Sequence, residues 1–212
     1  MNAGFDFHAL LQPERRGEYA FVGQSLPTED SPAIYGGQLM AQVLGVAART
    51  LPEARTAHYL QTCFLAFGDP AGELAFSVTP SRDGRSTSHR VIEVSQAGRI
   101  LMTATASFQS GAEGYDHQVE RPDVHPPQEL ARDPANYIEW AGPDGDFPFL
   151  IIEQPGNSGP ESYVWARPRA AVDGDALLHQ MLFAFLSDAT ILQSALQPHD
   201  LDWEQPDVAI AT

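Results

Sequence analysis

The sequence contains no lysine, because all 12 of its basic residues are arginines. Without a lysine amine, a Walker-type phosphate loop and every Schiff-base or pyridoxal mechanism are excluded. The single cysteine, Cys63, excludes an intramolecular disulfide and is compatible with a reducing compartment, so we expect a cytoplasmic protein. No apolar stretch approaches the roughly 20 residues needed to span a bilayer. Residues 1–16 lack the basic segment and long apolar run of a secretion signal.

The chain is strongly acidic, with 28 acidic residues against 12 basic ones and a formal net charge of −16. A surface of this sign repels a phosphate backbone, so we expect no nucleic-acid partner. Of its 212 residues, 43% are hydrophobic and 19% are charged, which is enough apolar material for a core and excludes a disordered chain. The length fits one large domain or two small ones.

The first half of the chain predicts one main helix followed by antiparallel strands. A short helix over 5–12 and a strand over 19–24 come first. The segment YGGQLMAQVLGVAART (35–50) then predicts a helix that Pro52 stops.

From His58 onward, apolar residues alternate with polar ones, as in strands. Four strands are expected, over 58–67, 73–82, 86–96 and 99–109. Asp83-Gly84 and Ala97-Gly98 separate the last three strands and are typical of hairpin turns. One helix followed by such a meander predicts an α+β unit whose sheet wraps the helix.

The second half begins with a different composition. Residues 111–160 are rich in proline and glycine, which predicts a linker with short ordered pieces near 135–141 and 148–153. A strand over 162–172 and a long helix over 177–196 follow, and the terminal VAIAT has strand composition. The order strand, helix, proline-bearing loop and strand therefore occurs twice, which indicates an internal repeat.

Asp188 lies in the middle of the predicted helix over 177–196, at the centre of its apolar face. On a helical wheel its nearest neighbours are all apolar: Met181, Ala184, Phe185, Ile191, Leu192 and Ala195. A buried carboxylate is costly unless it is paired, hydrogen-bonded or protonated. A structural acid that pairs with a buried arginine, or faces solvent through a kink, is the alternative. Because the helix contains no lysine or arginine, we favour a functional role.

Aligning the two repeats on Pro52 and Pro198 places Gln42 opposite Asp188. The first repeat then has an amide where the second has an acid, so it provides a scaffold without a base of its own.

Two further features are candidates for substrate contact. Gly36 and Gly37 precede a helix, whose first N–H groups bind anions or polarised carbonyls, although a tight turn alone also explains them. His58 begins a strand, where a lone histidine is more often structural than catalytic.

Arginines near the predicted hairpins, at positions 82, 85, 90 and 99, form a phosphate-binding edge or solvate the open face of the sheet. The HDLD segment (199–202) has no second histidine at ligand spacing, which favours a solvated acidic loop over a metal site. The sequence contains neither a Gly-x-Ser-x-Gly elbow nor a GxGxxG segment.

Several collinear stretches resemble the TesB-type acyl-CoA thioesterases, also called acyl-CoA thioesterase II. In the first half they are YGGQLMAQVLGVAARTLP, HYLQTCFLAFGDP and SRDGRSTSHRVIEVSQAGRILMTATASFQ. In the second half they are VWARPRAAVDGDALLHQMLFAFLSDATILQSALQPH and the terminal DVAIAT. Only the segment 111–160 matches poorly.

The resemblance implies a double hotdog fold, in which two sheets each wrap a long central helix, and hydrolysis of fatty acyl-CoA without a metal or other cofactor. The family's catalytic aspartate and threonine fall on Asp188 and Thr212, whereas its glutamine has no counterpart. Asp188, with a pKa raised by its apolar surroundings, would act as general base on a water that Thr212 also binds. We expect five further residues to contact the substrate: Gly36, Gly37, His58, Arg82 and Ser86.

On this basis we expect an N-terminal hotdog over 1–115, a linker over 116–160 and the first part of a C-terminal hotdog over 161–212. The sequence stops at Thr212, before the remaining strands of the second hotdog. A fragment or frameshifted reading frame is favoured over an omitted C-terminus or a short homologue completed by oligomerisation. We also expect a homo-oligomer through the hotdog sheets and little activity from this chain alone.

Two other functions stay open. A non-catalytic module that binds acyl-CoA or acyl carrier would keep the binding groove without turnover. A different hotdog enzyme, such as an enoyl hydratase or dehydratase, is less favoured, because the neighbouring aspartate and histidine typical of such enzymes are not found here.

Overall fold

The computed structural model describes residues 11–25, 33–111, 113–141, 143, 147–155, 161–199 and 201. These residues form two compact units. The sheet unit contains the described residues of 6–113 and 174–189, and the hairpin unit contains those of 114–173 and 190–201.

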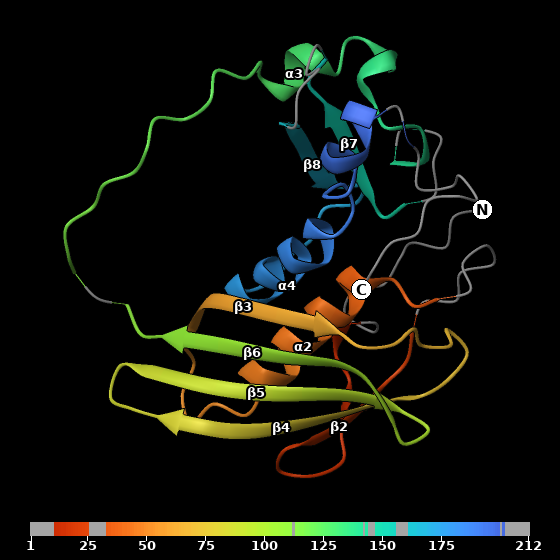
Figure 1. Cartoon of the computed structure of the whole chain (residues 1–212). Coiled ribbons are helices and arrows are strands. Elements are labelled where there is room, and N and C mark those ends of the chain that lie inside the picture. The colour runs from red at the N-terminus through yellow and green to blue at the C-terminus, as the bar shows by residue number, and fades with distance from the viewer. Residues whose placement is uncertain are drawn as a thin grey trace. The chain divides into compact units, whose positions relative to one another are not determined.

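The sheet unit combines six antiparallel strands with a long helix (Figure 1). The strand order is β1-β2-β4-β5-β6-β3, so β3 forms one edge of the sheet. The strands are β1 (Glu14–Arg15), β2 (Ala20–Gly23), β3 (Thr56–Phe64), β4 (Leu74–Asp83), β5 (Thr87–Gln96) and β6 (Arg99–Gln109). Helix α2 (Gly36–Ala48) packs on the sheet. The predicted strand over 19–24, the four later strands and the helix over 35–50 are confirmed, with small shifts of their ends.

Alternating side chains determine which face of the sheet forms the core. In β3, residues 60, 62 and 64 are half-buried, whereas residues 59, 61 and 63 are exposed, as the alternation predicts.

The β5–β6 hairpin turns at Ala97 and Gly98, whose φ angles are 49° and 81°. Both residues adopt the left-handed conformation that a tight hairpin turn requires.

Helix α4 (Ala176–Ser187) belongs to the sheet unit and packs against α2. Its buried side chains are Leu178, Met181, Leu182, Ala184 and Phe185. The Asp175 side chain caps its first turn by accepting a hydrogen bond from the Leu178 N–H at 2.9 Å.

The single helix predicted over 177–196 is wrong beyond Ser187, because α4 ends there with Asp188 as its C-cap. Two side chains near this end bond to backbone groups instead of supporting further helical turns. The Ser187 hydroxyl donates to the Ala184 carbonyl at 2.8 Å, and the Asp188 carboxylate accepts from another helix. The short helix α5 (Gln193–Leu196) follows after a turn.

The hairpin unit contains two antiparallel strands, β7 (Phe149–Glu153) and β8 (Val164–Pro168). Its short helices are α3 (Pro127–Leu130), η1 (Pro134–Asn136), η2 (Glu139–Ala141), α5 and η3 (Gln197–His199). The ordered pieces expected near 135–141 and 148–153 are therefore present within the segment read as a linker. The domain boundaries themselves stay a prediction.

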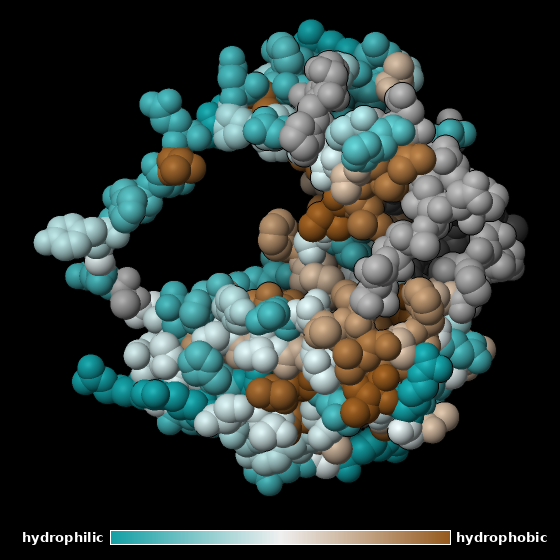
Figure 2. All heavy atoms as spheres, viewed as in Figure 1, coloured by the Kyte–Doolittle hydropathy of each residue, from teal (hydrophilic) through white to brown (hydrophobic). Residues whose placement is uncertain are grey.

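Hydrophilic residues cover much of the visible face of the sheet unit, with patches of apolar residues between them (Figure 2). Among the described residues, no helix combines the length and apolar character that crossing a membrane requires. The predicted helix over 5–12, apart from Leu11 and Gln12, and the terminal VAIAT lie outside the described residues.

Candidate active site

Asp188 lies where the end of α4 meets the start of α2. Its Oδ2 atom accepts a hydrogen bond from the Gly37 backbone N–H at 2.9 Å. The N-cap residue of α2, Tyr35, supplies no side-chain cap, so the first turn of α2 is capped from a distant part of the sequence. A carboxylate at a helix N-terminus also interacts favourably with the helix dipole.

The glycine pair makes this approach possible. A Cβ atom added to Gly37 would lie 2.1 Å from the Phe185 carbonyl oxygen, and one added to Gly36 would lie 2.8 Å from Asp188 Oδ2. Any larger side chain would separate the two helices at this point. The structure thus brings the glycine pair into contact with Asp188, a contact that spacing along the sequence does not predict.

Burial raises the pKa of the Asp188 carboxyl, and the hydrogen bond from Gly37 lowers it; burial has the larger effect, so the pKa is raised overall. Nearby, burial and the Asp188 charge both raise the pKa of Tyr35, which keeps its hydroxyl protonated. That hydroxyl donates to the Phe185 carbonyl oxygen at 2.8 Å. Tyr35 was missed as a site residue, although its position directly before the glycine pair was a signal.

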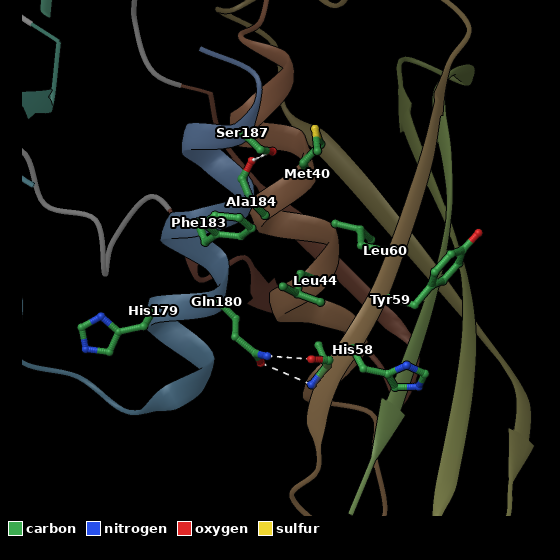
Figure 3. Close-up of a pocket in the computed structure, with 11 residues that line it drawn as sticks. Met40, Leu44, His58, Tyr59, Leu60, His179, Gln180, Phe183, Ala184 and Ser187 are labelled. Atoms are coloured by element: carbon green, nitrogen blue, oxygen red, sulfur yellow. Dashed lines mark hydrogen bonds between the residues drawn. The ribbon is translucent and has the colours of Figure 1, made fainter. Parts of the chain in front are cut away.

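His58 lies away from this carboxylate. Its Nε2 atom is 2.8 Å from the Ser107 hydroxyl, a hydrogen bond to strand β6. Figure 3 shows the His58 and Tyr59 side chains on the side of β3 that points away from α4. Phe64, at the other end of β3, is the strand residue beside Gly36.

Arg82 and Ser86 are also distant from Asp188 along the sheet. Arg82 lies near the end of β4, and Ser86 follows in the connection to β5. The strand register places this hairpin level with the start of β3, whereas Phe64 ends β3 next to Gly36. The structure therefore does not bring Arg82 or Ser86 to the Asp188 end.

Arg90, considered for a phosphate-binding edge, is fully buried. Its guanidinium donates to Asp83 at 2.9 and 3.1 Å and to the Thr50 hydroxyl at 2.9 Å. The Arg90 guanidinium therefore bonds to groups within the fold and is not available to a phosphate.

Thr212 lies outside the described residues, as do Asp200 and Asp202 of the HDLD segment. Within the described part of the chain, no cluster of three or more histidine, cysteine, aspartate or glutamate side chains could hold a metal ion.

Known proteins share both the sequence pattern and the fold. Residues 26–109 match the family described as acyl-CoA thioesterase N-terminal domain, and residues 148–212 match the family described as acyl-CoA thioesterase. The chain is 28% identical to acyl-CoA thioesterase 2 of Haemophilus influenzae over 219 residues, covering 96% of this chain and 76% of that protein.

Two solved structures are similar over most of their length. A tesB protein from Mycobacterium avium subs paratuberculosis has a TM-score of 0.75 and 30% sequence identity, covering 91% of this chain and 72% of that one. An acyl-CoA thioesterase II, TesB2, from Mycobacterium marinum has a TM-score of 0.71 and 27% sequence identity, covering 88% of this chain and 68% of that one.

The central helix, the antiparallel sheet and these structural matches define a hotdog-fold thioester hydrolase. More particularly, the chain belongs to the TesB-type acyl-CoA thioesterase II family. The fold expected from the resemblance is therefore confirmed.

Proposed function

We propose that the chain hydrolyses fatty acyl-CoA thioesters to free fatty acid and CoA, with Asp188 as the general base. The observation that carries this proposal is the half-buried Asp188 carboxylate held by the Gly37 N–H at the start of α2. A base whose pKa is raised towards neutrality removes a proton more effectively than an ordinary aspartate.

In the proposed reaction, the Gly37 hydrogen bond fixes Oδ2 and orients the carboxylate. The other oxygen, Oδ1, accepts a proton from water while the water oxygen bonds to the thioester carbonyl carbon. The carbonyl oxygen gains negative charge, which the partial positive charge at the start of α2 stabilises. When the intermediate collapses, the C–S bond breaks and the CoA sulfur leaves as the thiolate. The thiolate takes up the proton that Asp188 accepted from water, which regenerates the base.

Four further residues take part in the proposed reaction. Thr212 would bind the attacking water, and His58, Arg82 and Ser86 would contact the substrate away from the reacting carbon. A homo-oligomer through the hotdog sheets is likewise a prediction, which analytical ultracentrifugation of the chain would check.

Thiol release from acyl-CoA, followed with a thiol reagent, tests the proposal. We expect Asp188→Asn to lower kcat/KM by about 10²- to 10⁴-fold, the usual contribution of a general base, because the amide cannot accept the proton. Asn keeps an oxygen for the Gly37 N–H, so the variant should fold normally by circular dichroism.

Asp175→Asn is the matched control. Asp175 also accepts a helix N–H at 2.9 Å, but through a local cap at the exposed start of α4. Its replacement should leave kcat/KM within about twofold, since Asn is an equally good cap. Equal losses in both variants, or full activity in Asp188→Asn, would contradict the assigned role. Tight acyl-CoA binding without thiol release would instead support the binding module.

A further inference from the structure

Tyr35 bonds to both of the helix ends that meet at Asp188. Its backbone carbonyl accepts hydrogen bonds from the Gln38 N–H at 3.1 Å and the Leu39 N–H at 3.5 Å, in the first turn of α2. Its side-chain hydroxyl donates to the Phe185 carbonyl oxygen at 2.8 Å, in the last turn of α4. One residue therefore joins the start of α2 to the end of α4.

The last carbonyl groups of a helix have no donor within the helix, so they need partners from elsewhere. In α4 the Ala184 carbonyl accepts from the Ser187 hydroxyl of the same turn at 2.8 Å. The Phe185 carbonyl accepts from Tyr35, which lies 150 residues away in the chain. The Tyr35 hydroxyl thus ties the last turn of α4 to a different helix.

The Tyr35 ring also lies against the Gly37 backbone. A Cβ atom added to Gly37 would lie 2.6 Å from Tyr35 Cε1 and 2.1 Å from the Phe185 carbonyl oxygen. The ring packs edge-on against the Phe185 ring, with centroids 4.9 Å apart and an angle of 62° between the planes. The donor of the Asp188 hydrogen bond is therefore held between Tyr35 and the backbone of α4.

We propose that Tyr35 is a positioning residue for the reaction, because its hydroxyl fixes the last turn of α4 where the Gly37 N–H can hold Asp188. The inference rests on the proposed function, in which that hydrogen bond orients the general base. Asp188 is the third residue after Phe185, so a displacement of the Phe185 carbonyl moves the carboxylate with it. A hydrogen bond weakens steeply as its geometry departs from linear, so a small displacement weakens the Gly37 contact.

A purely structural role for the Tyr35 hydroxyl makes a different prediction. If the hydroxyl only satisfies the Phe185 carbonyl, its removal will lower stability. The hydrogen bond between Gly37 and Asp188, and the turnover of the folded chain, will then stay as they are in the wild type.

Few ionisable side chains lie on the elements that pack around the end of α4. Helix α2 has none, α4 has His179, and β3 has His58, Tyr59 and Cys63. His179 precedes Asp188 by nine residues, which is more than two helical turns. His58 and Tyr59 point away from α4 (Figure 3), and Cys63 is exposed. A change at the Gly37 amide with pH therefore reports the ionisation of Asp188.

The first test follows the Gly37 amide by NMR during a pH titration of the wild type and of Tyr35→Phe, which keeps the ring and removes the hydroxyl. In the wild type the amide proton should shift as Asp188 ionises, because a carboxylate is a stronger acceptor than a carboxylic acid. In Tyr35→Phe this shift should fall to about half or less, because the hydrogen bond is no longer held in line. A shift as large as in the wild type would overturn the positioning role.

Thiol release from acyl-CoA gives the second readout. Tyr35→Phe should lower kcat by about two- to tenfold, the effect of losing one hydrogen bond, and leave KM within about twofold. An unchanged kcat, with Asp188-dependent hydrolysis still present, would overturn the inference and leave the proposed function intact. The NMR titration needs no hydrolysis, so a reduced Gly37 shift would support the role of Tyr35 in holding Asp188 even where the proposed function fails.

Tyr59→Phe is the matched control. The Tyr59 hydroxyl donates to Gln61 Oε1 at 2.6 Å on the exposed face of β3, away from α4 (Figure 3). Its removal should leave both kcat and the Gly37 shift as in the wild type. Equal losses in Tyr59→Phe and Tyr35→Phe would show that the effect does not come from the Phe185 contact, and would overturn the inference.

Discussion

The aspartates Asp83 and Asp188 lie at opposite ends of the sheet unit and have opposite electrostatic surroundings; Asp83 is exposed and Asp188 is half-buried. At one end Asp83 pairs with the fully buried Arg90 and accepts a hydrogen bond from Ser88 at 2.6 Å. At the other end Asp188 accepts a backbone N–H from Gly37. Burial raises the pKa of both carboxyls, but the Ser88 and Arg90 hydrogen bonds reverse the effect at Asp83, so its pKa is lowered.

The comparison shows how one fold separates a structural acid from a candidate base. The Arg90 guanidinium compensates the Asp83 charge and donates to both carboxylate oxygens. This pairing keeps the Asp83 carboxylate ionised. A single N–H compensates Asp188 only in part, so its carboxylate retains affinity for a proton. The difference lies in the partner that the fold places beside each side chain.

Removing the arginine from the structural end should have the largest effect on stability. Arg90→Met leaves the Thr50 hydroxyl and the carbonyl oxygens of Thr50, Arg82 and His89 without their donor. Each buried group that loses its partner costs about 1–3 kcal/mol of unfolding free energy, so the combined loss should be large. Urea denaturation measures the change. Arg82→Met, an exposed arginine on the same strand as Asp83, should change stability by less than about 0.5 kcal/mol. Similar losses in both variants would show that the Arg90 network is not specific.

Forcing the helices apart at the other end should have a smaller effect on stability but a clear effect on activity. The Cβ atom of Gly37→Ala would lie 2.1 Å from a backbone carbonyl, so the helix ends must shift, at a cost of about 1–3 kcal/mol. Because the shift moves the Gly37 N–H relative to Asp188, we expect kcat/KM to fall at least tenfold.

Gly45→Ala is the matched substitution in the same helix. Its Cβ would meet the flexible end of Met181, 2.5 Å from the Cε atom, which can move aside. It should therefore retain most of the activity. If Gly45→Ala were as damaging as Gly37→Ala, the effect would come from α2 packing in general and not from the Asp188 contact.

The smallest expected effect is a pH dependence of opposite sign at the two ends. Asp83 has a lowered pKa in the folded state, so it stabilises the fold above its unfolded pKa and this contribution is lost as the pH falls through the folded value. Asp188 has a raised pKa, so its protonated form favours folding at low pH and this contribution is lost as the pH rises through the folded value.

Urea denaturation from pH 3 to pH 8 should therefore separate Asp83→Asn from Asp188→Asn. The difference from wild type should grow with rising pH for Asp83→Asn, as a net loss of stability. For Asp188→Asn, the difference from wild type should also grow with rising pH, but as a net gain of stability. Slopes of the same sign would contradict the contrast. In the wild type, kcat/KM should also increase with pH as Asp188 loses its proton.

Much of this architecture follows from local patterns. Alternation predicts the strands, and the Ala97-Gly98 turn occurs where the sequence predicts a hairpin. Of the six apolar neighbours that the helical wheel gives Asp188, Met181, Ala184 and Phe185 are buried, whereas Ile191, Leu192 and Ala195 are exposed because the helix ends before them. These features depend on neighbouring residues, whose preferences a sequence records directly. The end of α4 at Ser187 was missed, since the apolar spacing continues beyond it while the polar side chains stop the helix.

The sequence by itself determined that an acid follows an apolar helical segment and that a glycine pair begins another helix. Only the tertiary structure decided that these features meet, because the Gly37 N–H and the Asp188 carboxylate are 151 residues apart in the chain. It also decided that the buried Arg90 pairs with Asp83 and that the Gln180 side-chain amide donates a hydrogen bond to the Ala57 carbonyl. Such partners depend on how helices and strands pack across long separations, and packing is set by shape and burial over the whole unit, not by spacing along the chain.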